Sequence, residues 1–258
     1  MVRARFAVAI IVLLFAGLSA AQKQDQKPAK KDLQPDEIIK AFTANETQLY
    51  DVWTQYYYRQ IATIKILSVD DTPVSEAMTL KFEVVFLDNG TREVKLIERS
   101  GRLLSLLWTD EDRDAITNYS PFALTAKDLS SYSLTYEGKE KVDELTTYVF
   151  SVTPKSAEIG KLHFKGRIWV DDADLQIVRT VGRVFILKDP SQLVPQFPEF
   201  ETLRQLVDKK YRFPVWSHAD SVLEYAKPVA QRLRVEETIT YEGFKRFTST
   251  VNVKPVKK

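Results

Sequence analysis

The residue types that most often do chemistry are scarce in this sequence. It has no cysteine and only two histidines, His163 and His218, which excludes disulfides, thiolate zinc sites, cysteine nucleophiles and a multi-histidine metal centre. The sequence places no partner beside either histidine, so both are interpreted as solvated strand or turn residues. The sequence contains no phosphate-binding, dinucleotide-binding, nucleophile-elbow or zinc-protease motif. We therefore expect no catalytic residue, no metal and no cofactor, and a protein that is not an enzyme.

Acidic residues are the remaining candidates for chemistry. The run Asp171-Asp172-Ala173-Asp174 could chelate calcium, but it lacks the glycine and the distal glutamate of a calcium loop, which favours a solvated hairpin turn. Asp110-Glu111-Asp112 follows Thr109 and is typical of acids at a helix N-terminus. A carboxylate-based hydrolase stays open as an alternative, because any two of the 35 acids could meet in the fold. It requires two inward acids in a cleft with separated proton affinities.

The first 34 residues are expected to lie outside the folded domain. Arg3 and Arg5 precede an apolar run, and Ser19-Ala20-Ala21 offers small residues for cleavage, so residues 1–21 predict a secretory signal peptide. Residues 22–34 are polar and Lys-rich and predict a flexible tether. Without the leader, basic and acidic residues are equal in number, and a neutral surface is a poor partner for nucleic acid. Export without disulfides favours the periplasm of a bacterium with an outer membrane.

The remaining residues, 35–258, predict a single domain with one helix followed by many strands. Apolar residues at helical spacing behind Pro35 predict an amphipathic helix over 35–52. From Tyr56 the apolar period changes to two, which predicts about ten antiparallel strands with one apolar and one polar face. A sheet of this size curls or closes, and the helix is expected to cover its apolar concavity. The candidate strands include 79–86, 91–99, 132–136, 147–152, 161–170, 175–187, 211–225, 231–241 and 245–253, with Asp88-Asn89-Gly90 as a hairpin turn, Gly138 as a strand end and 189–198 as a Pro-bearing loop.

Large apolar side chains on these strands are the candidates for lining a ligand cavity. Several share the parity that faces the expected helix, where ordinary core packing is the competing interpretation for each of them. Which interpretation applies depends on whether the helix fills the concavity completely. The candidate lining residues are Phe82, Phe86, Trp108, Phe150, Phe164 and Ile168.

Several strand-and-turn blocks of the sequence resemble a known family. Residues 136–143 (YEGKEKVD) and 148–155 (YVFSVTPK) precede the most recognisable pair, G-R-I-W-V-D at 166–171 and L-Q-I-V-R at 175–179 across the acidic hairpin. Together they are similar to outer-membrane lipoprotein-sorting (LolA-like) proteins. The blocks 211–215 (YRFPV) and 241–247 (YEGFKRF) fit an envelope subgroup of that superfamily rather than the sorting chaperone proper.

The resemblance implies an open antiparallel half-barrel, plugged by helices on its concave side, with a hydrophobic cavity for acyl chains. On this basis we expect an exported periplasmic protein that holds a lipid or the acyl chains of a lipoprotein and carries or sorts it within the envelope, with peripheral membrane contact allowed. The alternative is a non-catalytic interaction or sensor module with a filled cavity, whose partners are other envelope proteins.

Overall fold

The computed structural model describes residues 33–69, 76–87, 92–106, 108–119, 123–188, 197–225 and 231–247. The predicted leader, most of the tether and the Asp88-Asn89-Gly90 turn lie outside these residues. The described chain contains the helix α1 (Pro35–Trp53), the short helices α2 (Asp110–Asp114), η1 (Ala115–Tyr119) and η2 (Asp128–Ser130), and ten strands. The strands are β1 (Tyr56–Leu67), β2 (Glu76–Phe86), β3 (Arg92–Arg102), β4 (Tyr132–Val142), β5 (Leu145–Pro154), β6 (Leu162–Asp171), β7 (Ile177–Ile186), β8 (Glu199–Val207), β9 (Tyr211–Tyr225) and β10 (Gln231–Arg246).

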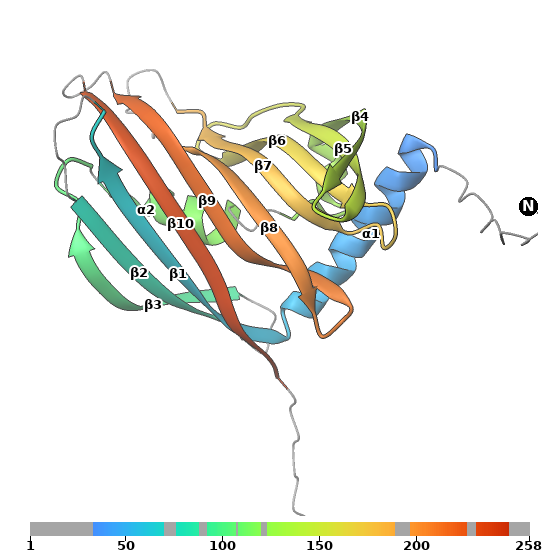
Figure 1. Cartoon of the computed structure of the whole chain (residues 1–258), viewed down its shortest axis with the longest axis horizontal. Helices are drawn as coiled ribbons and strands as arrows, with labels where there is room; N and C mark the ends of the chain where they lie inside the picture. The colour runs from blue at the N-terminus through green and yellow to red at the C-terminus, as the bar shows by residue number, and fades with distance from the viewer. Residues whose placement is uncertain are drawn as a thin grey trace, which may run out of the picture. The chain divides into compact units, whose positions relative to one another are not determined.

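The ten strands form one antiparallel sheet in the order β3-β2-β1-β10-β9-β8-β7-β6-β5-β4. Its edges, β3 and β4, do not pair with each other, so the sheet is open, and α1 and α2 lie on its concave side (Figure 1). The first and the last strand pair with each other as the third and fourth strands of the sheet, where Ile64 of β1 lies opposite Glu237 of β10. This confirms the predicted open half-barrel with an N-terminal amphipathic helix.

Helix α1 begins and ends where the sequence predicts, within one residue. Pro35 stands at its first turn, and the Glu37 carboxylate accepts a 2.9 Å hydrogen bond from the backbone N–H of Gln34. Its buried face carries Ile38, Phe42 and Leu49. Phe42 packs against Phe150 of β5, with ring centroids 5.8 Å apart. The helix is thus held by its apolar stripe on the sheet.

Two strand assignments differ from the sequence-based expectation and offset each other in the count. β8 was not predicted, because its inward face carries Phe200, Thr202 and Arg204 instead of an apolar series. Conversely, β10 is one continuous strand to Arg246, whereas the sequence suggested a break before a separate strand at 245–253, of which residues 248–253 lie outside the described residues. The predicted total of about ten strands is therefore correct because the missed strand β8 offsets the extra strand predicted at 245–253.

Gly138 does not end its strand, contrary to the prediction. It has φ +114° and lies at an irregularity between Tyr136 and Gly138 in the pairing of β4 with β5, after which β4 continues to Val142. A bulge adds local twist and bends the strand, which suits glycine at a positive φ. Further irregularities occur in the β1–β10, β2–β3, β6–β7 and β8–β9 pairings, and together they help to curve the sheet.

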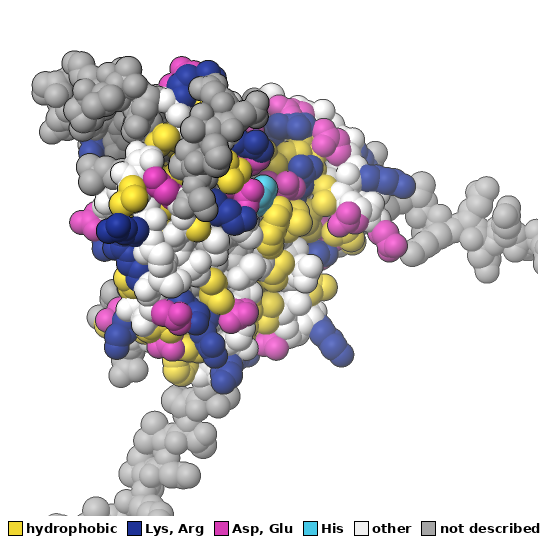
Figure 2. Space-filling view, turned by 60° about the vertical axis from the view of Figure 1, so that its left-hand side comes forward, with side chains coloured by type: hydrophobic (Ala, Val, Ile, Leu, Met, Phe, Trp, Pro, Cys, Tyr) yellow, Lys and Arg dark blue, Asp and Glu magenta, His cyan; other side chains and the backbone are white. Residues whose placement is uncertain are grey.

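The outer face of the sheet is mainly polar but holds a small cluster of its own. Trp169 packs there with Val149 and Val178, and the guanidinium groups of Arg167 and Arg179 lie 4.9 Å and 4.5 Å from its ring. Elsewhere on the surface, basic, acidic and hydrophobic side chains are interspersed on the face seen in Figure 2. The main core lies on the inner face, under the helices.

Candidate functional site

A short segment forms a roof over the middle of the sheet. This roof segment consists of α2 and η1, residues 110–119. It begins at a capping box, in which Thr109 Oγ1 accepts from the N–H of Asp112 at 3.2 Å and the Asp112 carboxylate accepts from the N–H of Thr109 at 2.7 Å. The sequence predicted this capped helix correctly. Its second turn is a π-helix, an irregularity that is frequent at functional sites.

Three side chains of the sheet side hold the roof segment in place. Gln60 of β1, which is fully buried, donates to the carbonyl oxygen of Ile116 at 2.8 Å. Arg92 of β3 donates to the carbonyl oxygen of Thr117 at 2.9 Å. Lys188, after β7, pairs with Glu111 of α2 at 2.8 Å. The roof is therefore attached by a few polar contacts at defined points.

A small cavity of about 40 Å³ lies between the roof segment and the sheet. At about 10–15 Å³ per water it has room for a few water molecules. Its walls come from the roof, from five adjacent strands and from the residues just before β8. The lining residues are Ile64, Leu106, Trp108, Asp112, Ala115, Ile116, Val184, Phe197, Pro198, Phe200, Leu223, Val235 and Glu237.

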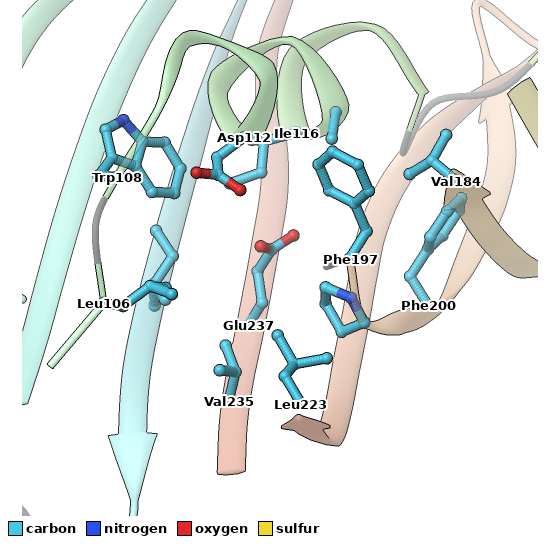
Figure 3. Close-up of a pocket in the computed structure, with 13 residues that line it drawn as sticks. Leu106, Trp108, Asp112, Ile116, Val184, Phe197, Phe200, Leu223, Val235 and Glu237 are labelled. Carbon is cyan, nitrogen blue, oxygen red and sulfur yellow. The ribbon is translucent and has the colours of Figure 1, made fainter. Parts of the chain in front are cut away.

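Two carboxyl groups face each other in this apolar cavity (Figure 3). Glu237 projects from the inner face of β10, between Val235 and Ile239 on the same parity, and Asp112 projects down from α2. Burial raises the pKa of Glu237 to about 8, and the negative charge of Asp112 contributes to that rise. Burial also raises the pKa of Asp112, against the hydrogen bonds from Thr109. Both shifts favour the protonated form relative to the same group in water.

The pair bears on the hydrolase alternative, which requires two inward acids in a cleft. Asp112 and Glu237 are such acids, and the sequence analysis had assigned Asp112 only to a helix start and had not singled out Glu237. However, their pKa values move in the same direction, and the space between them is far below the roughly 300–1,000 Å³ of ordinary ligand sites. A sugar residue has no room beside them in this arrangement, so we do not propose glycoside cleavage.

A larger cleft of about 840 Å³ lies on the other side of the roof segment. Glu111, Asp114, Thr117 and Asn118 of the roof face this cleft, whereas Asp112, Ala115 and Ile116 face the cavity, so the roof segment separates the two spaces. The cleft combines apolar side chains with charges of both signs. Its lining consists of Thr47, Tyr50, Asp51, Trp53, Phe86, Arg92, Glu111, Asp114, Thr117, Asn118, Ala123, Thr125, Lys127, Asp128, Gly160, Lys161, Leu162 and Ile186.

The sequence predicted a cavity between α1 and the sheet. This space contains a buried ion pair. Arg204 Nη1 of β8 donates to both carboxylate oxygens of Glu46, at 2.8 Å and 3.0 Å, and both side chains are almost fully buried. The Glu46 carboxylate also accepts from the backbone of Leu124 and Ile177. Desolvation raises the pKa of Glu46, while Arg204 opposes the rise. This network fixes α1 on the sheet.

The six predicted lining residues fall into three environments, and their role in ligand binding remains a prediction. Trp108 lines the small cavity and Phe86 lines the cleft. Phe82, Phe150, Phe164 and Ile168 are buried in the core. Phe164 is held tightly, because a Cβ at Gly182 would lie 2.6 Å from its ring.

The other residues singled out from the sequence have ordinary structural partners. His163 Nε2 lies 2.9 Å from the backbone nitrogen of Glu158, and His218 stacks on Trp216. In the acidic hairpin, Asp171 and Asp174 accept from Arg212 at 2.6 Å and 2.9 Å. Among the described residues, no group of three or more acidic, histidine or cysteine side chains is arranged to hold a metal ion.

Comparisons with known proteins give structural neighbours only. No family model matches the chain, and no curated protein matches it. Structurally similar chains include a LolA superfamily protein from Nitrosomonas europaea (11% identity, TM-score 0.34, covering 84% of this chain and 95% of that chain). A DUF1329 family protein from Desulfovibrio piger has 12% identity and a TM-score of 0.39, with 84% and 95% of the two chains covered. A candidate outer membrane lipoprotein-sorting protein domain from Vibrio parahaemolyticus has 12% identity and a TM-score of 0.36, with 82% and 94% covered.

The chain is similar in fold to LolA superfamily proteins. The strand-and-turn blocks of the sequence resemble the same superfamily, and the function proposed below rests on the chain's own cavity, cleft and side chains. Among the described residues, none of the helices is both long and apolar enough to cross a bilayer.

Proposed function

We propose that this chain is a non-enzymatic, exported binding protein that holds the acyl chain of a lipid or lipoprotein against the concave face of its sheet. One observation carries the proposal: the roof segment separates an amphipathic cleft of about 840 Å³ from an apolar-walled cavity over the middle of the sheet. Displacement of this one short segment would join the two spaces into a continuous site.

The hydrophobic effect supplies the driving force for such a ligand. At about 0.8 kcal/mol per buried methylene, a chain of roughly fourteen carbons gives a gross stabilisation of about 11 kcal/mol. Part of this offsets the loss of the contacts that hold the roof segment, each worth about 1 kcal/mol. The remainder is enough for binding and still allows release.

The rim of the cleft suits the polar end of an amphiphile. Lys127 provides a cation and Asp51 and Asp114 provide anions around the apolar side chains of the cleft, while Lys161 is paired with Glu158 at 2.6 Å. A headgroup with a charge of either sign therefore finds a counter-charge at the entrance, while the acyl chain is directed toward the sheet. The cleft therefore suits an amphiphile, and the charge of its headgroup is not specified by the lining residues.

Native mass spectrometry of the purified protein and uptake of a fluorescent acyl probe test the proposal. Tyr50 lines the cleft and is 52% exposed, and Leu206 of β8 lies outside both lining sets and is 48% exposed, so the two provide matched substitutions. We expect Tyr50→Glu to weaken uptake by about tenfold, from the loss of about 1.4 kcal/mol of apolar contact, and Leu206→Glu to leave it unchanged. No copurified lipid together with no uptake would overturn the proposal.

A second function is favoured by the small volume of the cavity. At about 40 Å³ the space beneath the roof segment is nearly filled, as expected of an interaction or sensor module that binds other envelope proteins. Crosslinking in cells distinguishes the two: this alternative predicts a stable protein partner and no bound lipid, whereas the acyl-binding function predicts bound lipid that Tyr50→Glu removes.

A further inference from the structure

The two facing carboxyl groups in the cavity stand on different elements, one on the roof segment and one on the sheet. Asp112 belongs to α2, and Glu237 belongs to β10 at the middle of the sheet. We propose that Asp112 and Glu237 form a proton-dependent latch, which holds the roof segment on the sheet while protons are bound and releases it when both groups ionise. This inference rests on the proposed function, because the opening that it controls is the passage from the cleft to the cavity.

The chemistry of the pair follows from its surroundings. The two carboxyl groups point toward each other (Figure 3), so protonation of either one removes the repulsion between two like charges. A carboxylic acid can also donate a hydrogen bond to a carboxylate that comes within reach, which would hold the two elements together. Two carboxylates between apolar walls repel each other and are incompletely solvated, because the cavity has room for only a few water molecules. Only movement of the roof segment, which admits water, relieves both costs at once.

The elements packed around Glu237 bring no cation into the cavity lining. On the neighbouring strands it pairs with Ile64 of β1 and Ala219 of β9, which are uncharged. Asp112 is the one other charged residue that lines the cavity within the described part of the chain. Arg92 lines the cleft on the other side of the roof segment and donates to Tyr58 Oη and to the roof backbone. Among the described residues, no cation in the cavity lining can neutralise the two carboxylates, so their charge is set by proton binding alone.

The neighbouring charges on β10, β1 and β9 are turned to the opposite face and neutralised there. Glu236, next to Glu237, pairs with Lys65 at 2.7 Å, and Asp220 pairs with Arg234 at 2.6 Å. On α2 the remaining acids are engaged away from the cavity, Glu111 with Lys188. The titration of these surface pairs does not bear on the latch.

The expected response follows from linkage between protonation and opening. In the closed state the pKa of Glu237 is about 8, whereas exposure to water would return it toward 4.5. The open population then rises by up to about tenfold per pH unit across that interval, and it levels off above it. Replacement of Glu237 by glutamine removes the charge but keeps a hydrogen-bond donor, so Glu237→Gln should hold the roof closed at every pH.

The absence of native cysteine allows a direct readout of opening without any ligand. In an Ala115→Cys variant the single thiol lies on the buried underside of the roof segment, and its rate of labelling reports exposure. Comparison with Ala115→Cys/Glu237→Gln at each pH cancels the intrinsic ionisation of the thiol. We expect the ratio of the two rates to rise at least tenfold from about pH 6 to about pH 9. A ratio that stays constant overturns the latch.

Hydrogen exchange of the amides of residues 110–118, with the same pair of backgrounds, replaces the labelling assay if Ala115→Cys does not fold. A fluorescent acyl probe without an ionisable group then separates the latch from the proposed function. Uptake that is equally fast at about pH 6 and about pH 9, with constant exposure of the roof, refutes the latch and leaves acyl binding standing. Exposure that rises with pH while the probe never binds supports the latch and refutes acyl binding.

Discussion

The ion pair between Glu46 and Arg204 leads to the sharpest prediction on stability. Both side chains are at most 1% exposed, and the Glu46 carboxylate also accepts two backbone hydrogen bonds. Glu46→Ala would leave the Arg204 guanidinium buried without its counter-charge, which costs about 3–5 kcal/mol. At about 2–4 °C per kcal/mol, the melting temperature should fall by about 6–20 °C.

Thermal and urea unfolding, followed by circular dichroism, measure this loss, and a double replacement provides the control. Glu46→Leu/Arg204→Met exchanges the pair for apolar side chains of similar size, and it should recover most of the stability that either single replacement removes. The result that would refute the reasoning is a cost below about 1 kcal/mol for Glu46→Ala, since that is the value of an exposed pair. Equal losses in the single and double variants would also contradict it.

Three further predictions follow from the packing and the titration of the site. Gly182→Ala should destabilise the fold by about 3 kcal/mol in urea unfolding, because the new Cβ would lie 2.5 Å from a backbone oxygen of β6; wild-type stability would disprove this close approach. Thr109→Ala should cost about 1 kcal/mol and speed hydrogen exchange in α2, whereas Thr109→Ser should not. The unfolded chain loses the Glu237 proton near pH 4.5, whereas the folded protein keeps it up to about pH 8. The wild type should therefore lose stability relative to Glu237→Gln as pH rises through that window, by at most about 5 kcal/mol. A difference in unfolding free energy that is constant with pH would contradict the raised pKa.

Period-two alternation predicted most of the sheet because most strands present an unbroken apolar face to the core. β8 escaped because its inward Arg204 reads as a surface residue until Glu46, 158 positions earlier, is known to meet it. A pairing of that range leaves no local trace in the sequence. The over-division of β10 has the opposite cause: Gly243, at φ +68°, has the character of a turn residue, but it lies at an irregularity in the β1–β10 pairing, after which β10 continues to Arg246.

The sequence does mark Glu237, although no functional motif includes it. Leu233, Val235, Ile239 and Tyr241 share one parity of β10, and Glu237 stands in the middle of that series. A charge within an apolar face indicates either a strand that is not buried there or a buried acid with a role. What no local pattern could give is its counterpart, since Asp112 is brought opposite by the roof segment.

The place of β10 beside β1 has a consequence for how the protein is made. Among the ten strands, β10 joins the β1–β3 ladder to the β4–β9 ladder and is synthesised last, whereas its partner β1 is synthesised first. A nascent chain that ends before Gln231 can assemble the β1–β3 ladder and the β4–β9 ladder, but it lacks the strand that pairs them into one sheet. Final assembly must wait for the carboxyl-terminal segment, and such distant pairing is slow to form. We therefore expect the sheet to stay incomplete until the whole of β10 has been synthesised.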